Sequence, residues 1–122
     1  MEGRRVLVAR ASEARDVLPE ALSARGAQVD VVPLYETVAE PLSDTDLAAL
    51  ERADYVTFTS SSTVRFLMQA AGSFPAGARL VSIGPVTSEE AGRHGLDVHV
   101  EASQHDIDGL VDALVGDVAV AR

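Results

Sequence analysis

Hydrophobic residues occur along this chain in two alternating patterns. Compact runs rich in β-branched residues are typical of buried strands, whereas longer segments repeat an apolar residue every three or four positions, as amphipathic helices do. The predicted strands are 5–10, 29–34, 55–59, 80–83 and 98–100, and the predicted helices are 16–25, 43–50, 60–72, 84–95 and 107–114. Because strands and helices alternate throughout, we expect an α/β fold whose parallel sheet is covered by helices on both faces.

Residues that start or stop regular structure support most of these boundaries. Gly26 follows the first predicted helix, where a left-handed residue is often needed, and Pro33 ends the second strand or places it at an edge of the sheet. Thr87 and Glu90 have the spacing of a capping box at the start of the fourth helix. Gly116 is expected to come after the last helix.

The two halves of the pattern resemble each other weakly. Residues 6–32 and 80–100 each run strand, polar loop, helix, glycine and a Val-x-Val strand. Such an echo is expected from an internal duplication. It is also expected from packing alone, since all parallel α/β units share this order. Both explanations stay open at this point.

Composition narrows the class of protein. The 122 residues suffice for one compact domain, and the absence of cysteine excludes disulfides, thiol nucleophiles and thiolate metal sites. All ten basic residues are arginine, so lysine-dependent Schiff-base and P-loop chemistry is excluded. A net charge of −9 argues against nonspecific binding to nucleic acid or anionic membranes. With no long apolar run and no signal-type start, we expect a cytoplasmic protein without membrane association.

Three polar segments follow predicted strands, namely 10–15, 59–63 and 84–88. In open α/β sheets, ligands bind beyond the carboxyl ends of strands, where helix N-termini present free amide groups. Hydroxyl groups, amides and a helix dipole suit a carboxylate or a phosphate. The alternative is purely structural, since serine and threonine are also good helix caps. The three histidines lack metal-site spacing, and Glu89 and Glu90 suit a first helical turn as well as an acid–base pair.

Four segments, in this order and spacing, together resemble one known family, the uroporphyrinogen-III synthases. They are 29–38 (Val-Asp-Val-Val-Pro-Leu-Tyr-Glu-Thr-Val), 55–64 (Tyr-Val-Thr-Phe-Thr-Ser-Ser-Ser-Thr-Val), 82–91 (Ser-Ile-Gly-Pro-Val-Thr-Ser-Glu-Glu-Ala) and 105–114 (His-Asp-Ile-Asp-Gly-Leu-Val-Asp-Ala-Leu). The resemblance is to the C-terminal half of the family's chain, and it extends from about Arg4 to Val115.

The resemblance implies a fold and a reaction. Members of the family have two flavodoxin-like α/β lobes with the substrate in the cleft between them. They cyclise the linear tetrapyrrole hydroxymethylbilane to uroporphyrinogen III, inverting the last pyrrole ring and releasing water, without a cofactor or a metal. Substrate carboxylates are bound largely by backbone amides at loops and helix starts. A net-negative protein can hold such a polyanion if local dipoles point toward it.

The resemblance also assigns roles to two side chains in the matching segments. Tyr35 matches the tyrosine of the family's cleft and becomes the candidate catalytic residue that assists departure of the hydroxyl group. Its alternative role is that of a packed aromatic residue in a connector. Thr87 matches the threonine of the Ile-Gly-Pro motif and is a candidate hydrogen-bond donor to substrate. The alternative for Thr87 is the capping box described above.

The remaining candidate substrate-binding residues also follow predicted strands. Ser60, Ser61 and Ser62 match the family's serine-rich loop, in which relatives often have a proline at the position of Ser61. Gly84 belongs to the Ile-Gly-Pro motif, and Arg10 matches the end of the first strand of this half. No metal ligand is implied.

Length is the main departure from the family, whose members carry a further half before the matching segment. By resemblance, residues 1–38 form a first βαβ unit of one lobe and residues 39–122 a second α/β unit of the other. Three arrangements follow: one sheet within the chain, a homodimer that swaps its N-terminal units, or a requirement for a separate missing half. The sequence favours the swapped homodimer. A non-catalytic module that binds a tetrapyrrole or another polycarboxylate, or an inactive fragment, are the alternatives to an enzyme.

Overall fold

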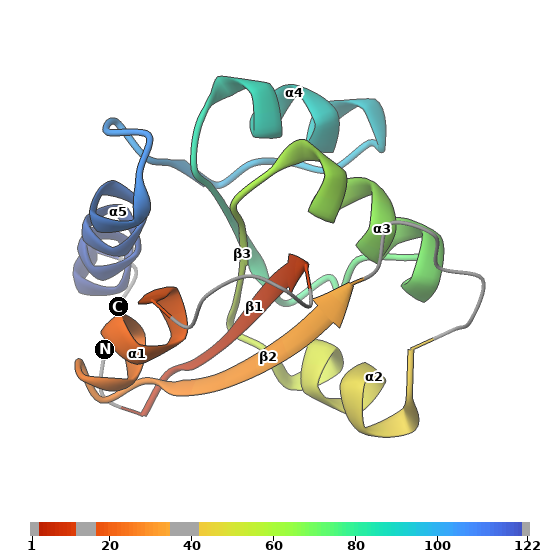
Figure 1. Ribbon diagram of the computed structural model, residues 1–122, viewed down its shortest axis with the longest axis horizontal. Coiled ribbons are helices and arrows are strands. Elements are labelled where there is room, and N and C mark those ends of the chain that lie inside the picture. The colour runs from red at the N-terminus through yellow and green to blue at the C-terminus, as the bar shows by residue number, and fades with distance from the viewer. Residues whose placement is uncertain (1–2, 12–16, 35–41, 121–122) are drawn as a thin grey trace.

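The computed structural model describes residues 3–11, 17–34 and 42–120, and for 9–11, 17, 33 and 34 it describes the backbone only. Strands and helices alternate along this part of the chain, as the sequence predicts (Figure 1). The elements are β1 (Arg5–Ala11), α1 (Val17–Ser23), β2 (Gln28–Leu34), α2 (Asp44–Arg52), β3 (Tyr55–Phe58), α3 (Ser61–Ala71), β4 (Arg79–Ser82), α4 (Pro85–Arg93), β5 (Val100–Glu101) and α5 (Ile107–Val120).

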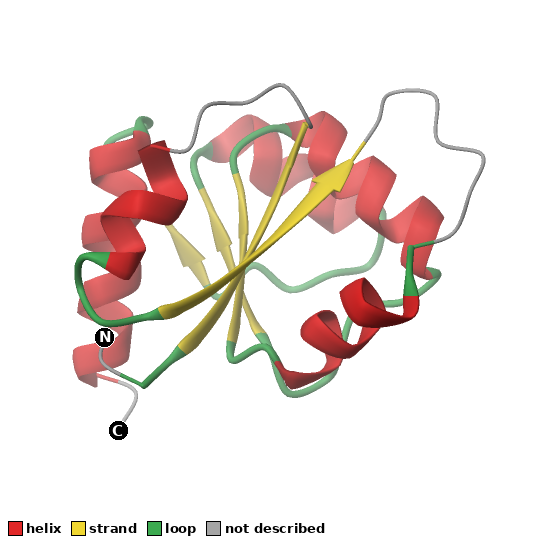
Figure 2. Cartoon of the chain, turned by 60° about the horizontal axis from the view of Figure 1, so that its bottom comes forward, coloured by secondary structure: helices red, strands yellow, loops and turns green. Residues whose placement is uncertain are grey.

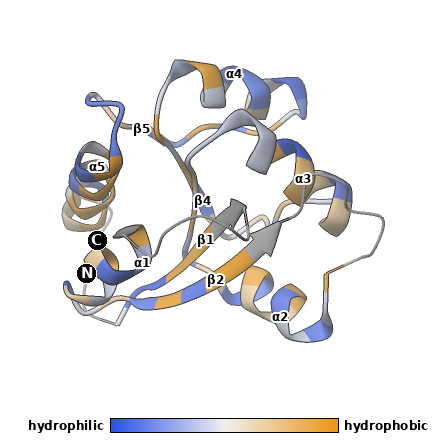
Figure 3. Cartoon of the chain, viewed as in Figure 1, coloured by the Kyte–Doolittle hydropathy of each residue, from blue (hydrophilic) through white to orange (hydrophobic). Residues whose placement is uncertain are grey.

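The five strands form one parallel sheet in the order β2-β1-β3-β4-β5, which confirms the predicted parallel α/β fold. β1 pairs with β3 in a register that places Val6 opposite Tyr55 and Ala9 opposite Phe58. This pairing joins the first βαβ unit to the later strands within a single chain, as in the first of the three arrangements above. β2 lies at an edge, as Pro33 predicts, and polar and apolar residues alternate over its first four residues, Gln28–Val31 (Figure 3).

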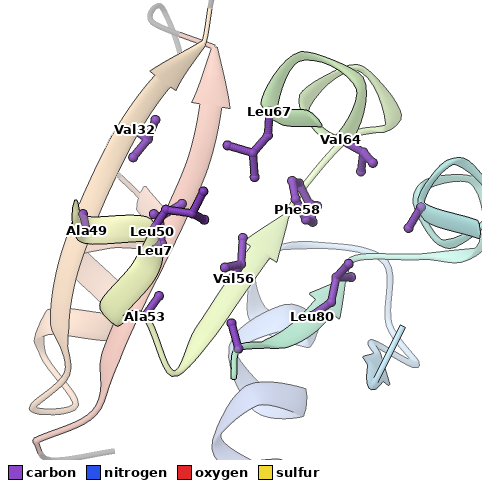
Figure 4. Packing of buried hydrophobic residues seen from close by; sticks show 12 residues of the cluster. Leu7, Val32, Ala49, Leu50, Ala53, Val56, Phe58, Val64, Leu67 and Leu80 are labelled. Carbon is purple, nitrogen blue, oxygen red and sulfur yellow. The ribbon is translucent and has the colours of Figure 1, made fainter. Parts of the chain in front are cut away.

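Helices cover both faces of the sheet (Figure 2). On one face, Leu7, Val56, Phe58 and Leu80 pack against α2, α3 and α4 (Figure 4). On the other face, alternate residues of the same strands pack against α1 and α5. Every side chain named here is at most 4% exposed, so burial on two faces explains why the central strands are continuously apolar. The residues of the second face include Val6, Val8, Tyr55, Val81, Leu18, Leu22, Leu110, Leu114 and Val118.

α4 begins after Gly84, as predicted, but its cap differs from the prediction. The N-cap is Gly84 rather than Thr87, and no side chain caps the helix, so the expected capping box with Glu90 is wrong. Pro85 at the first helical position lacks an amide hydrogen and needs no acceptor there. The amide N–H of Gly84 donates to Ser82 Oγ at 3.2 Å, which holds the chain as it enters the helix.

Two element ends also differ. α5 continues through Gly116 to Val120, because Val118 still packs against the sheet beyond the glycine. β5 begins at Val100 rather than at residue 98, because the side chain of His99 replaces part of the strand ladder. In the described residues, no helix has the length and apolar composition needed to cross a membrane.

Candidate functional site

The carboxyl ends of β1, β3 and β4 lie at the same edge of the sheet, because these neighbouring strands are parallel. The chain leaves β1 toward β2 on one side and leaves β3 toward β4 on the other, so the strand order reverses between β1 and β3. Such a switch point opens a crevice at the carboxyl ends of the strands, where ligands of open α/β sheets bind. Helices α3 and α4 begin at this edge (Figure 1).

The serine-rich segment forms the N-terminus of α3. Ser60 is the N-cap, and its hydroxyl accepts a hydrogen bond from the amide N–H of Thr63 at 3.3 Å. The hydroxyl of Thr63 donates to the carbonyl of Ser60 at 2.7 Å, and the hydroxyls of Ser60 and Ser62 lie 3.1 Å apart. These contacts confirm that the segment caps a helix. Ser60, Ser61 and Ser62 are all half-buried.

The first turns of α3 and α4 carry amide groups that no helical carbonyl can reach. In any α-helix the first N–H groups have no intrahelical acceptor. At α3 the N–H of Thr63 is used by Ser60, which leaves those of Ser61 and Ser62 without an intrahelical partner. At α4 the first intrahelical bond is that of Ser88 to the carbonyl of Gly84, so the N–H groups of residues 86 and 87 have none. With the helix dipoles, these amides favour an anionic ligand.

The structure brings some of the predicted site residues together, and others lie outside its described atoms. The structure brings Ser60–Ser62 and the Gly84–Thr87 turn to one edge of the sheet. Thr87 is only 4% exposed, so its side chain is turned into the protein rather than toward solvent, and Gly84 is buried. Arg10 lies near the carboxyl end of β1, but its side chain is outside the described atoms. Tyr35 lies outside the described residues.

A group of polar side chains beside Gly84 was not identified from the sequence. Ser82 Oγ donates to the carbonyl of Gly84 at 2.8 Å, and Ser88 Oγ lies 2.9 Å from Ser82 Oγ and 2.6 Å from Glu101 Oε1. The ring of His105 covers Gly84 so closely that a Cβ atom there would lie 3.2 Å from its Cγ. In the sequence, the only feature that pointed to this group was Ser82, a serine two residues before the Gly-Pro turn. Glu101 and His105 come close only through the pairing of β5.

Glu90, which the sequence analysis considered as part of an acid–base pair, instead connects α3 to α4 through charged contacts. Its carboxylate is 6% exposed and lies 3.2 Å from Arg93 Nη1, 3.1 Å from His94 Nε2 and 3.9 Å from Arg65 Nη1. Beside this cluster a groove of about 490 Å³ separates α3 from the end of α4. Its lining residues are Arg65, Met68, Gln69, Gly72 and His94, none of which the sequence analysis predicted for the site. A smaller groove of about 360 Å³ lies between β5 and α5.

A second charged cluster lies at the opposite, amino edge of the sheet. Asp117 of α5 accepts from Arg79 Nε at 2.8 Å, from Arg79 Nη2 at 3.0 Å and from the hydroxyl of Tyr55 at 2.8 Å. The Arg79 guanidinium lowers the pKa of Asp117, and burial together with Asp117 raises the pKa of Tyr55 to about 12. Because β3 and β4 both begin here, this cluster fastens α5 to the sheet and lies away from the candidate site.

No group of three or more His, Asp and Glu side chains in the described part of the chain is arranged to hold a metal ion. The first-turn amides and serine hydroxyls at the carboxyl edge favour recognition of an anion. Both the 59–63 and the 84–88 segments lack acidic residues, although the whole chain carries 19.

Comparison with known proteins gives consistent matches. The family model of uroporphyrinogen-III synthase HemD matches residues 1–112. The uroporphyrinogen-III synthase of Synechococcus elongatus is 36% identical over 128 residues, which cover 92% of this chain and 47% of the relative. A relative from Methanothermobacter thermautotrophicus is 32% identical over 111 residues, covering 88% of this chain and 43% of its own length.

A solved structure shares the fold. The crystal structure of uroporphyrinogen-III synthetase from Helicobacter pylori matches with a TM-score of 0.53 and 21% sequence identity, covering 94% of this chain and 54% of that one. The chain thus spans about half the length of the curated relatives and of the solved structure that it matches.

Proposed function

Since the chain belongs to the uroporphyrinogen-III synthase family, we propose that it is the C-terminal half of such an enzyme and contributes to its reaction. In that reaction hydroxymethylbilane is cyclised to uroporphyrinogen III with loss of water. The chain binds part of the linear tetrapyrrole at the carboxyl edge of its sheet. As in the sequence analysis, we place the protein in the cytoplasm.

One observation carries the proposal. The N-termini of α3 and α4 meet at one edge of the sheet, beside the switch point between β1 and β3, and their first-turn amides have no intrahelical acceptor. The hydroxymethylbilane side chains are carboxylates, which such amides bind with charge-assisted hydrogen bonds. The two segments contain no acid of their own, and the helix dipoles and first-turn amides supply the attraction against the nearby Glu101 and a net charge of −9.

Each candidate residue then has a defined task. The amides of Ser61 and Ser62 and those that follow Gly84 bind substrate carboxylates, and the Ser60 and Ser62 hydroxyls orient the first turn of α3. Arg10 supplies a positive charge at the end of β1. The buried Thr87 takes part through its backbone amide rather than its hydroxyl. The gain in rate comes from holding a flexible chain with its ends together.

Tyr35 assists the covalent step. The bond between the terminal carbon and its hydroxyl oxygen breaks, and the hydroxyl leaves as water with a proton donated through the phenol. The electron-deficient carbon then forms a carbon–carbon bond with the last pyrrole ring at the ring position that already carries the methylene bridge, giving a spirocyclic intermediate. The bond from that ring to its original methylene carbon breaks and re-forms at the other α position, which inverts the ring and releases one proton. No oxidant or reductant is needed, because one carbon–oxygen bond is replaced by one carbon–carbon bond and the rearrangement breaks and forms one bond each. The phenol regains its proton from solvent or from the pyrrole position that loses one.

A cleft for this substrate requires a second lobe. The chain covers under half of each curated relative, so the second wall comes either from a second copy that exchanges its N-terminal unit or from a separate half. For this chain acting alone, two copies exchange the N-terminal units that pair through β1 and β3 within the single chain described above. Light scattering at micromolar concentration tests this exchange: a dimer mass is expected, and a stable monomer rejects it.

The decisive experiment adds one negative charge at the proposed site. Ser61→Asp places a carboxylate in the first turn of α3, where it suits the helix dipole and preserves the fold but repels a substrate carboxylate. Ser73→Asp is the matched control, since the exposed Ser73 lies past the far end of the same helix, ~16 Å away along its axis. We expect Ser61→Asp to raise the KM for hydroxymethylbilane about tenfold or more, and Ser73→Asp to leave it unchanged.

The assay separates isomer III from isomer I, which forms spontaneously. Production of isomer III that Tyr35→Phe slows several-fold supports the enzyme. Tight binding of the product with isomer I alone, insensitive to Tyr35→Phe, identifies a non-catalytic binding module. Equal effects of the two aspartates reject the carboxyl edge as the site. Neither turnover nor binding, with poorly cooperative unfolding, identifies an inactive fragment.

A further inference from the structure

A continuous hydrogen-bonded chain runs from an exposed carboxylate to the turn that starts α4. Glu101 Oε1 lies 2.6 Å from Ser88 Oγ, Ser88 Oγ lies 2.9 Å from Ser82 Oγ, and the amide N–H of Gly84 donates to Ser82 Oγ at 3.2 Å. The members come from β5, α4 and β4, so the chain connects three elements. Ser82 is completely buried, whereas Glu101 is exposed.

Each hydroxyl carries a single hydrogen, and this sets how the hydrogen-bonded chain responds to Glu101. Ser82 donates its hydrogen to the carbonyl of Gly84 at 2.8 Å and accepts from the amide N–H of the same residue at 3.2 Å. The hydroxyl of Ser88 lies 2.6 Å from Glu101 Oε1 and 2.9 Å from Ser82 Oγ, and an ionised carboxylate is the stronger acceptor of its hydrogen. If Glu101 is removed, the hydrogen of Ser88 turns to Ser82 Oγ, where it competes with the amide N–H of Gly84 for the same oxygen.

We propose that Glu101 is a positioning residue for the substrate-binding turn at residues 84–88, acting through Ser88 and Ser82. Gly84 is the N-cap of α4 and no side chain of the helix itself caps it, so the Ser82 hydroxyl is the group that fixes its amide. With Gly84 fixed, the amides of residues 86 and 87 keep one orientation at the carboxyl edge. The substrate part of this inference rests on the proposed function, whereas the effect on Gly84 does not.

The place of Glu101 in the fold favours this role over simple stabilisation. β5 is only two residues long, Val100–Glu101, and pairs with β4 through Val81 and Ser82. A carboxylate at the end of so short a strand contributes little to packing. The same carboxylate lies at the edge that receives a polyanion, and its hydrogen bond to Ser88 holds it beside α4.

The first test needs no substrate. Amide hydrogen exchange of Gly84, followed by NMR in the full chain, reports on its bond to Ser82. We expect Glu101→Ala to raise its exchange rate about tenfold, and Ser88→Ala, which also removes the competing hydroxyl, to leave the rate unchanged. Glu101→Gln keeps an oxygen that accepts from Ser88 and is expected to restore most of the protection. Glu51→Ala, the same change at an exposed position in α2, is the control and should have no effect.

The second test uses turnover. A positioning role in binding predicts that Glu101→Ala raises the KM for hydroxymethylbilane severalfold with little change in kcat, and that Glu101→Gln restores the KM. A merely structural role would lower the active fraction, and hence the apparent kcat, at unchanged KM. Unchanged Gly84 exchange in Glu101→Ala overturns the inference, and so does an equal rise in Ser88→Ala. If the wild-type chain neither binds nor converts the substrate, the proposed function fails, and the exchange measurement still decides the role of Glu101.

Discussion

The amide N–H of Leu80 donates a hydrogen bond to Nδ1 of His99 at 2.9 Å, so an imidazole takes the place that a strand carbonyl would occupy. The amide of His99 donates back to the carbonyl of Leu80 at 3.1 Å. One residue thereby satisfies both backbone groups of Leu80, which is completely buried. The bond fixes the tautomer of His99 with its proton on Nε2. It also explains why β5 starts at Val100, since the hydrogen bond before it is made by the His99 side chain instead of a backbone carbonyl.

Replacing His99 therefore tests how much its hydrogen bond with the Leu80 amide contributes to stability. His99→Ala leaves the buried N–H of Leu80 without its acceptor, and we expect a loss of about 1–3 kcal/mol in the free energy of unfolding. His99→Asn places an amide oxygen close to the position of Nδ1 and should lose less than about 1 kcal/mol. Urea denaturation measures both. Equal losses in the two variants would show that the hydrogen bond contributes nothing measurable.

This bond illustrates where sequence patterns are sufficient and where they are not. Periodicity and turn residues predict the alternating elements, the parallel sheet and the edge position of β2, because each depends on local composition or on burial of whole faces. The start of β5 depends instead on one side chain mimicking a carbonyl. The end of α5 depends on tertiary packing of Val118, which outweighs the helix-breaking tendency of Gly116.

The candidate site likewise has features that the sequence predicts and features that it does not. Ser60 could be predicted as a helix cap because capping is a local property of the chain. The hydrogen bonds that connect Glu101 to Gly84 could not be predicted, because the residues that form them are brought together by the β4–β5 pairing and by the turn into α4. The inward position of Thr87 was also hidden, since it depends on how α4 packs against the sheet and not on where the helix starts.

The phenol of Tyr55 should titrate unusually late. Burial and the hydrogen bond to Asp117 raise its pKa to about 12, against an ordinary tyrosine pKa near 10. The folded state thus keeps a proton that the unfolded chain releases. Its contribution, at most about 3 kcal/mol for two pKa units, is complete below pH 10 and is lost as the pH rises toward 12. Absorbance titration of a Tyr35→Phe variant isolates Tyr55. Ionisation near pH 10 in the folded protein would contradict the geometry.

Asp117 makes the corresponding contribution in acid. Hydrogen bonds from Arg79 lower its pKa in the folded state. This stabilisation is present above the ordinary carboxyl pKa of about 3.9 and is lost as the pH falls through the lowered value. Asp117→Asn removes the titration, so its free energy of unfolding should fall less steeply with acidification than that of the wild type. Asp112→Asn, at an exposed position of the same helix, is the control and should follow the wild-type slope. A parallel slope for Asp117→Asn would exclude the ion pair as a source of acid sensitivity.

Two glycines of α5 should respond to alanine in opposite directions. A Cβ atom on Gly109 would overlap the carbonyl group of Gln104, where the preceding loop folds against the helix. We expect Gly109→Ala to cost more than about 2 kcal/mol of stability, because backbone has to move. A Cβ on Gly116 meets no atom within 4 Å, and Gly116→Ala should stabilise the helix by about 0.5–1 kcal/mol. Thermal or urea unfolding distinguishes them, and a stabilising Gly109→Ala would show that the loop lies elsewhere in solution.

Alanine at Gly84 should affect the site more than the fold. The backbone there is extended, with φ of −177°, so any residue can adopt it, and only the ring of His105 is in the way, 3.2–3.3 Å from a new Cβ. Because His105 is exposed and can rotate, the cost in stability should stay below about 1 kcal/mol. In a His105→Ala background the conflict disappears, and the same substitution should change the stability by less than about 0.5 kcal/mol, because the gain from a less flexible unfolded chain is offset by the poorer N-cap.

The comparison of the two backgrounds is a double-mutant cycle, in which a positive coupling energy isolates the contact between Gly84 and His105. The same cost in both backgrounds would assign the strain to the backbone of the turn instead. Because Gly84 precedes the amides proposed to bind carboxylates, Gly84→Ala should raise the KM for hydroxymethylbilane by a larger factor than its small loss of stability accounts for. Removing His105 should reverse that increase, since the ring no longer pushes the turn.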